Sequence, residues 1–197
     1  MFAQLFELNK QLFLTLNQLG DIGIIRNIVS IFADAPIFLI PLFLVGFWLY
    51  YTKQKDISGK ERLLSVFYAT VLAIVFNIVI QKFVHIDRPA EFARSAGHFL
   101  LNHIPDASFP SDHASVGVAF ITALMLFGYK TIGYIVIPFF VIMFLSRVIG
   151  GVHWPLDILG GTIVGVVSGF AIAAIKENPY IGKCNRFIID TAHYFKL

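Results

Sequence analysis

Long apolar stretches without Asp, Glu, Lys or Arg dominate the pattern of hydrophobic and polar positions along the chain. Five of them are 16 to 19 residues long: Ala35–Thr52, Leu63–Gln81, Ala114–Tyr129, Thr131–Ser146 and Ile158–Ile175. A helix needs about 17–25 residues to cross a bilayer, and a charge at either end can reach the interface. The pattern therefore predicts an all-α integral membrane protein, a bundle of about five transmembrane helices. In the last stretch, Gly161, Gly165 and Gly169 form a small-residue stripe typical of close helix packing in lipid.

The first twenty residues show a different periodicity. Leucines recur at helical spacing, at Leu5, Leu8, Leu12, Leu16 and Leu19. This pattern predicts an amphipathic helix within residues 1–20 that lies on the membrane surface. If this segment entered the bilayer instead, the bundle would have six membrane helices.

Composition supports the membrane interpretation. Of 197 residues, 57% are hydrophobic and 14% are charged, against about 25% charged in an average soluble domain. A soluble chain of this size could not cover five apolar helices, so we interpret residues 1–197 as one membrane-embedded domain. The single cysteine, Cys184, cannot form an intramolecular disulfide or a zinc site of several thiolates. Nothing in the pattern of basic and aromatic residues suggests a nucleic-acid partner.

Basic residues are concentrated in the segments that would emerge on one side of a five-helix bundle. Nine of the fifteen lie there: Lys53, Lys55, Lys60, Arg62, Lys130, Lys176, Lys183, Arg186 and Lys196. The positive-inside rule predicts that this side is cytoplasmic. The opposite side receives five of the six histidines: His85, His98, His103, His113 and His153. We interpret His85, His98 and His103 as solvated loop residues, which leaves two histidines as candidates for chemistry.

Three polar segments fall at helix ends on the histidine side: Lys82–Pro89, Pro110–His113 and Ser146–Asp157. Ionisable groups at the edge of an apolar helix are costly unless they are paired or functional. Lys82, Arg88 and Arg147 supply cations, and Ser111 supplies a donor beside the N–H groups of a helix start. Because arginine forks suit phosphate oxygens, we interpret the three segments as one anion site.

Two histidines would face that anion. His153 and Asp157 are four residues apart, which places them on one helix face if the first turn of the last span extends to His153. The carboxylate can keep one ring nitrogen protonated and leave the other as a nucleophile. His113 can give a proton to the leaving oxygen. These residues predict phosphoryl transfer to histidine followed by hydrolysis, with the cations stabilising the transition state.

The three segments resemble the signature motifs of the type 2 phosphatidic acid phosphatase superfamily: Lys-x6-Arg-Pro, Pro-Ser-Gly-His and Ser-Arg-x5-His-x3-Asp. The third motif matches fully, at Ser146, Arg147, His153 and Asp157. The second has Asp112 where glycine is usual. In the first, Gln81 occupies the position of the lysine, and Lys82 is one residue nearer to Arg88. Such a shift turns a helical side chain by about 100°.

The resemblance implies a role for each matching residue. His153 would be the nucleophile and His113 the general acid, with Asp157 completing the catalytic set. The phosphate ligands would be Lys82, Arg88, Ser111 and Arg147, and neither a metal nor another cofactor would be needed. The form Pro-Ser-Asp-His resembles the bacterial undecaprenyl-diphosphate phosphatase branch, which recycles the polyprenyl carrier of peptidoglycan synthesis and can confer bacitracin resistance. Asp112 would then cap the helix or tune the phosphate site for a diphosphate.

The expected function is therefore hydrolysis of undecaprenyl diphosphate to undecaprenyl phosphate and phosphate, at the periplasmic face of the bacterial inner membrane. Its expected partners are the lipid phosphate or diphosphate and the bilayer. Phosphatidic acid, phosphatidylglycerophosphate or another isoprenoid diphosphate are alternative substrates, and an anion channel or transporter is an alternative class. Soluble vanadate haloperoxidases share the motif geometry, but five apolar spans argue against them.

Overall fold

The computed structural model describes residues 2–90, 100–101 and 107–195, and the regular structure in these ranges is helical. The helices are α1 (Phe2–Asn17), α2 (Gly23–Phe32), α3 (Leu39–Gln54), α4 (Ile57–Phe83), α6 (Asp112–Leu126), α7 (Lys130–Ile149), α8 (Pro155–Ile175) and α9 (Pro179–Tyr194), with the 3-10 turns η1 (Gln18–Asp21) and η2 (Ala35–Phe38). The predicted all-α fold is confirmed. Of the histidines named above, His98 and His103 lie outside the described ranges.

Each of the five predicted apolar runs contributes a helix: α3, α4, α6, α7 and α8. Within the described ranges, four stretches are long and apolar enough to cross a bilayer: Gly23–Gln54, Ile57–Phe83, Lys130–Ile149 and Pro155–Ile175. The first extends upstream of the predicted start at Ala35, because α2 is also apolar, and it is interrupted between α2 and α3 by η2. Helix α6 has 15 residues and is shorter than a typical span. The bundle therefore surrounds one short helix with longer ones.

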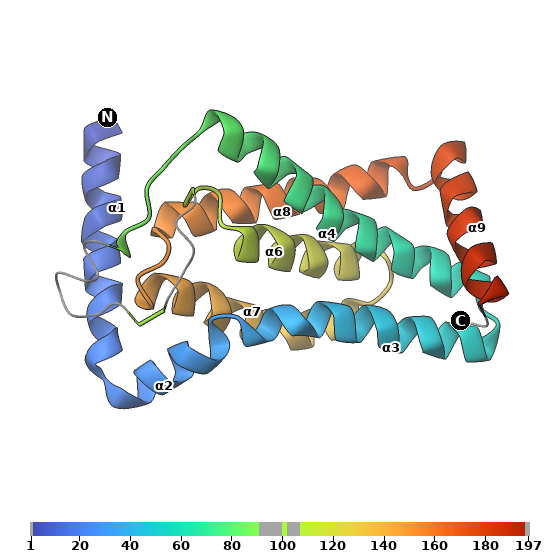
Figure 1. Cartoon of the computed structure of the whole chain (residues 1–197), viewed down its shortest axis with the longest axis horizontal. Coiled ribbons are helices and arrows are strands. Elements are labelled where there is room, and N and C mark those ends of the chain that lie inside the picture. The colour runs from blue at the N-terminus through green and yellow to red at the C-terminus, as the bar shows by residue number, and fades with distance from the viewer. Residues whose placement is uncertain (1, 91–99, 102–106, 196–197) are drawn as a thin grey trace.

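The five helices run along the length of the molecule, whereas α1 and α9 lie across its two ends (Figure 1). The end at α1 gathers the start of α6, the end of α7 and the start of α8 (Figure 1). The end at α9 gathers the links that carry the concentrated basic residues, because Arg62, Lys176 and Arg186 line one cavity there. No helix was predicted after Ile175, so the sequence pattern did not reveal α9.

The surface of the bundle is apolar and its centre contains both apolar and polar side chains. Phe120, Phe140 and Met143 are fully buried between the helices. Large hydrophobic side chains are exposed along the outer faces of the spans, among them Leu42, Val75, Ile135, Ile163 and Phe170. A belt of this kind is unfavourable in water and matches the hydrocarbon core of a bilayer. The protein is a membrane protein.

The glycine stripe brings α8 into direct contact with the backbone of α6. A Cβ atom at Gly165 would lie 2.6 Å from the Ser115 carbonyl oxygen and 2.7 Å from the Ala119 nitrogen. A Cβ atom at Gly161 would lie 2.6 Å from the carbonyl oxygen of Ser111. Because only glycine permits this approach, the start of α6 is held against the first turns of α8.

Helix α1 presents two different faces. Asn9, Phe13 and Asn17, spaced four residues apart, are buried against the bundle. The side chains of Leu5, Leu8 and Leu12 on the predicted apolar face are exposed. The helix therefore binds the protein through a stripe that the leucine pattern does not reveal, and it leaves the leucine face for the membrane interface.

Candidate active site

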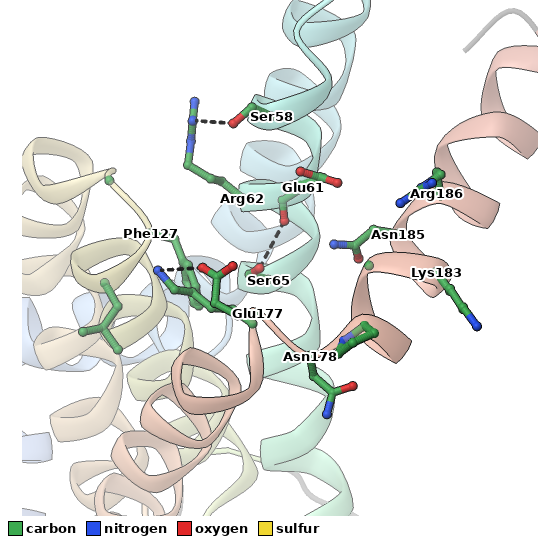
Figure 2. A pocket seen from close by; sticks show the side chains of 15 residues that line it. Ser58, Glu61, Arg62, Ser65, Phe127, Glu177, Asn178, Lys183, Asn185 and Arg186 are labelled. Atoms are coloured by element: carbon green, nitrogen blue, oxygen red, sulfur yellow. Dashed lines mark hydrogen bonds and ion pairs between the residues drawn. The ribbon is translucent and has the colours of Figure 1, made fainter.

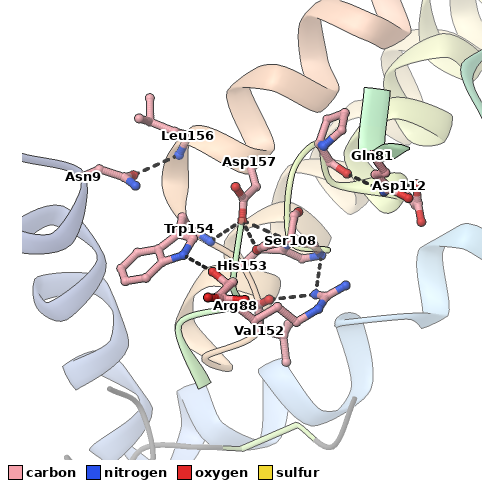
Figure 3. A network of polar contacts seen from close by, with 12 residues as sticks. Asn9, Gln81, Arg88, Ser108, Asp112, Val152, His153, Trp154, Leu156 and Asp157 are labelled. Atoms are coloured by element: carbon pink, nitrogen blue, oxygen red, sulfur yellow. Dashed lines mark hydrogen bonds and ion pairs between the residues drawn. The ribbon is translucent and has the colours of Figure 1, made fainter. Parts of the chain in front are cut away.

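His153 lies in the turn between α7 and α8 and is 2% exposed. Helix α8 begins at Pro155, so the helical first turn does not reach His153, and the predicted pairing with Asp157 comes from the turn instead. The Nδ1 atom of His153 is 3.4 Å from Oδ2 of Asp157 and 3.1 Å from the carbonyl oxygen of Ser108 (Figure 3).

The partners of the His153 ring determine where its proton is. A backbone carbonyl and a carboxylate can only accept, so Nδ1 carries hydrogen. The other nitrogen, Nε2, is 3.1 Å from Nη1 of Arg88, which can only donate. Nε2 therefore presents its lone pair beside a cation, which is the form of histidine that can attack phosphorus.

The Asp157 carboxylate is itself held by several donors. Its Oδ2 accepts a hydrogen bond from the Ser108 hydroxyl and another, at 2.8 Å, from the backbone N–H of Trp154. Asp157 is 1% exposed and Ser108 is fully buried. Ser108 therefore contacts both members of the pair, through its hydroxyl and its carbonyl. Ser108 was not predicted from the sequence, since no motif position or spacing marks it.

Arg88 lies on the extended segment that follows α4. Its Nη1 also donates to the carbonyl oxygen of Val152 at 2.8 Å. Beside it, the indole N–H of Trp154 donates to the Asp87 carbonyl oxygen at 2.8 Å. The same segment also accepts a backbone hydrogen bond, from the Ser108 N–H to the Ile86 carbonyl oxygen at 2.8 Å. Hydrogen bonds to backbone carbonyl oxygens thus place the first motif against the His153 turn.

Helix α1 holds the same turn from the outside. The side chain of Asn9 accepts from the Leu156 N–H at 3.1 Å, and that of Asn17 donates to the Ile149 carbonyl oxygen at 2.7 Å. Phe13 packs on the Trp154 ring with a centroid distance of 5.0 Å. The N-terminal helix therefore supports the segment that carries the candidate nucleophile.

The second half of the site is built around an acidic residue that the sequence analysis did not select. Arg147, at the end of α7, is 2% exposed, and its Nη1 is 2.7 Å from Oδ1 of Asp34. Nε2 of His113, in the first turn of α6, is 2.8 Å from the same oxygen. Asp34 is an acid within an apolar stretch, between α2 and η2, and that isolation is a sequence signal for a functional residue.

Backbone hydrogen bonds join the two halves. The N–H groups of Val152 and His153 donate to the Arg147 carbonyl oxygen at 3.2 and 3.3 Å. The Ser111 N–H donates to the Asp157 carbonyl oxygen at 3.1 Å. The Ser111 hydroxyl is fully buried and has no hydrogen-bond partner among the described residues. A phosphate oxygen is a suitable acceptor for this hydroxyl.

The remaining candidates lie to one side of this cluster. Oδ1 of Asp112 accepts from Asn77 of α4 at 2.6 Å and is 3.5 Å from Nε2 of Gln81 (Figure 3). The carboxylate thus faces α4, and Asn77 is a further polar residue that the sequence analysis missed. Lys82 is exposed at the end of α4 and makes no hydrogen bond or ion pair with the described residues.

A cavity of about 820 Å³ lies at the opposite end of the bundle, between α4, α9 and the end of α8 (Figure 2). Asn185 and Arg186 turn toward α4, whereas Lys183 points away from the cavity (Figure 2). The lining includes an ion pair of 3.7 Å between Lys176 and Glu177 but none of the motif residues. The candidate chemistry is therefore confined to the end at α1.

Comparison with known families identifies the superfamily of the chain. The model of the PAP2 superfamily matches residues 62–180, a segment that contains all three motifs. The chain belongs to the PAP2 superfamily. The family expected from the motifs is thereby confirmed.

Individual relatives cover most of the chain. It is 34% identical to the putative undecaprenyl-diphosphatase YbjG of Escherichia coli, over 81% of this chain and 78% of that protein. It is 29% identical to the undecaprenyl-diphosphatase BcrC of Bacillus subtilis, over 88% of each chain. The crystal structure of Aquifex aeolicus LpxE superposes with a TM-score of 0.69 at 24% identity, over 84% of this chain and 94% of that one. This last likeness shows the shared fold.

Proposed function

We propose that the protein hydrolyses a polyprenyl diphosphate, undecaprenyl diphosphate, to the lipid monophosphate and inorganic phosphate at the periplasmic face of a bacterial inner membrane. The observation that carries the proposal is the His153 imidazole, whose Nε2 lone pair lies beside Arg88. The relatives named undecaprenyl-diphosphatase support the choice of substrate.

In the first step, Nε2 of His153 attacks the terminal phosphorus. An N–P bond forms, the bond from phosphorus to the bridging oxygen breaks, and the lipid monophosphate leaves. His113 gives its proton to that oxygen. The positive charge on the substituted imidazole is stabilised by Asp157, whose carboxylate already faces Nδ1.

In the second step, water attacks the phosphohistidine. His113, now without its proton, takes one from the water as the new P–O bond forms and the N–P bond breaks. Phosphate leaves and His153 returns to its starting state. Arg88 and Arg147 stabilise the charge on the transferred group, with the Ser111 hydroxyl as a further donor. No step requires a metal, so we expect activity to persist in EDTA.

The test is release of phosphate by the detergent-solubilised protein from undecaprenyl diphosphate, farnesyl diphosphate, phosphatidic acid and phosphatidylglycerophosphate. We expect the highest kcat/KM for undecaprenyl diphosphate. His153→Ala should lower turnover to background. His113→Ala should lower it by about 10²–10⁴-fold for the monophosphate lipids and less for diphosphates, because a phosphate leaves more readily than an alkoxide.

The matched control is His193→Ala, which removes an exposed histidine of α9 at the other end of the molecule and should retain wild-type turnover. Full activity of His153→Ala would rule out the mechanism. Preference for phosphatidic acid or phosphatidylglycerophosphate would replace the proposed substrate, and phosphate binding without release from any lipid would favour an anion transporter.

A further inference from the structure

One oxygen of Asp34 is in contact with two groups that the proposed mechanism assigns to the substrate. Oδ1 lies 2.7 Å from Nη1 of Arg147 and 2.8 Å from Nε2 of His113. A phosphoryl or leaving oxygen held by Nη1 of Arg147 and Nε2 of His113 would have to occupy nearly the same point. The carboxylate and the substrate oxygen therefore cannot be bound there together.

The other carboxylate of the site behaves differently. Asp157 faces Nδ1 of His153 and leaves Nε2 directed at Arg88, so it orients the ring without covering the reactive nitrogen. Asp34 contacts Nε2 of His113 and Nη1 of Arg147 at the same time. An oxygen that bridges a histidine and an arginine resembles a bound anion more than an orienting partner.

Asp34 is also placed so that it can leave. Its side chain is 60% exposed, whereas that of Asp157 is 2% exposed. It lies at the start of η2 and makes no side-chain hydrogen bond to the N–H groups of that turn. Moving this carboxylate into water therefore breaks two polar contacts but opens no apolar core.

We propose that Asp34 occupies the anion subsite between Arg147 and His113 in the resting enzyme, is displaced by the substrate phosphate, and thereby selects highly charged phosphate groups over phosphodiester headgroups. This inference rests on the proposed function, since it takes the lipid phosphate as the displacing ligand. A terminal phosphate carries nearly two negative charges, and a diphosphate carries more. A phosphodiester headgroup carries one, the same as the carboxylate it would have to replace.

Charge and tethering together explain the selection. Attraction to Arg147 grows with the charge of the incoming group, so a phosphate dianion can displace Asp34. A singly charged phosphodiester has no such advantage, and Asp34 competes at the high effective concentration of a tethered group. In a bilayer rich in anionic phosphodiester lipids, the carboxylate would keep the subsite available to the substrate.

The experiment compares the wild type with Asp34→Asn, which removes the charge and retains the size. Binding of inorganic phosphate by the solubilised protein is measured by calorimetry, and phosphate release is measured in mixed micelles with increasing phosphatidylglycerol. We expect Asp34→Asn to bind inorganic phosphate about tenfold more tightly. In the wild type the Asp34 carboxylate occupies the subsite most of the time and competes with phosphate, and the substitution removes this competition. We also expect phosphatidylglycerol to inhibit Asp34→Asn at mole fractions that leave the wild type unaffected.

Asp87→Asn is the matched control, because it removes one carboxylate from the same end of the molecule. The Asp87 side chain is 96% exposed and pairs with His85, not with Arg147 or His113. This variant should bind phosphate like the wild type, which separates displacement from a general change in charge. Asp34→Ala should reproduce the tighter binding of Asp34→Asn.

The inference is overturned if Asp34→Asn binds phosphate no more tightly than the wild type, or if Asp87→Asn gains as much. A fall in kcat with unchanged phosphate affinity also overturns it and makes Asp34 a positioning residue for His113. If the wild type released no phosphate from any lipid, the proposed function would fail, while the calorimetric comparison would still decide whether Asp34 occupies the subsite.

Discussion

The two carboxylates of the site, Asp157 and Asp34, contact different ring nitrogens of the histidines beside them. Asp157 is buried with Ser108 and the Trp154 N–H as donors, and it faces Nδ1 of His153. A carboxylate removed from water needs such donors, since burial without hydrogen bonds is costly. Asp34 is exposed and faces Nε2 of His113. Because Asp157 is buried, its carboxylate is held in one position. Because Asp34 is exposed, its carboxylate can move into water and return.

At this scale we predict the effect of Ser108→Ala. The change removes one donor from Asp157 but keeps the carbonyl that accepts from His153. Because a hydrogen bond to a charged group contributes about 1.5–3 kcal/mol, kcat should fall by about 10- to 100-fold with KM nearly unchanged. The kcat and KM for phosphate release are the measurement.

Ser168→Ala provides the matched control for Ser108→Ala. Ser168 is also fully buried, and its hydroxyl donates to the Val164 carbonyl oxygen within α8, away from the site. It should lose little activity. Equal losses in both variants would mean that Ser108 contributes to general stability and does not position the catalytic pair.

At the scale of elements, the contact between α6 and α8 brings the motifs together. Helix α6 carries Ser111 and His113 at its start, and α8 carries Asp157 in its first turn. The glycine stripe sets the distance between the two helices, and the hydrogen bond from Ser111 to the Asp157 carbonyl oxygen joins their starts. A change in this spacing should therefore affect catalysis as well as stability.

We predict that Gly165→Ala destabilises the protein and lowers its activity. The added methyl group would collide with backbone atoms of Ser115 and Ala119, which cannot turn away as a side chain could. Overpacking of this kind costs about 1–3 kcal/mol. Thermal unfolding in detergent and phosphate release should both show the loss.

The control is Gly46→Ala in α3, where an added Cβ would meet nothing within 4 Å. Alanine is favoured over glycine in a helix interior by about 1 kcal/mol, so this variant should be as stable as the wild type or slightly more stable. If Gly165→Ala were as stable as Gly46→Ala, the close packing of α6 and α8 would not be a requirement of the fold.

At the scale of the whole molecule, the two ends of the bundle have different chemistry. The end marked by α1 in Figure 1 contains the candidate site. At the end marked by α9, two cavities are lined by most of the concentrated basic residues: Lys55, Lys60, Arg62, Lys176, Lys183 and Arg186. This arrangement agrees with the topology expected from the positive-inside rule. We therefore predict that the two ends face different compartments, with the site away from the cytoplasm.

Labelling of the single cysteine tests that orientation. Cys184 is exposed on α9, so we expect it to be cytoplasmic and to resist an impermeant thiol reagent applied to intact cells. Permeabilised cells should show full labelling. As a control, His85→Cys in a Cys184→Ser background should react in intact cells, because the His85 side chain is 72% exposed near the site. The reverse pattern would place the active site on the cytoplasmic face.

Hydropathy and motif spacing, which are local properties, determined much about this protein. The apolar runs predicted α3, α4, α6, α7 and α8, since a bilayer requires long apolar helices whatever packs beside them. The third motif predicted the pair of His153 and Asp157, although their contact comes from the turn before α8 and not from one helix face. The motifs also predicted membership of the PAP2 superfamily, which is confirmed.

Tertiary structure alone decided which distant residues complete the site. Ser108 reaches Asp157, and Asp34 reaches Arg147 and His113, across separations that no periodicity encodes. Packing also directed Asp112 toward α4 and left Lys82 exposed, although both belong to the motif segments. The reason is physical: the direction of a side chain depends on the helices packed around it, and that packing is a property of the whole bundle.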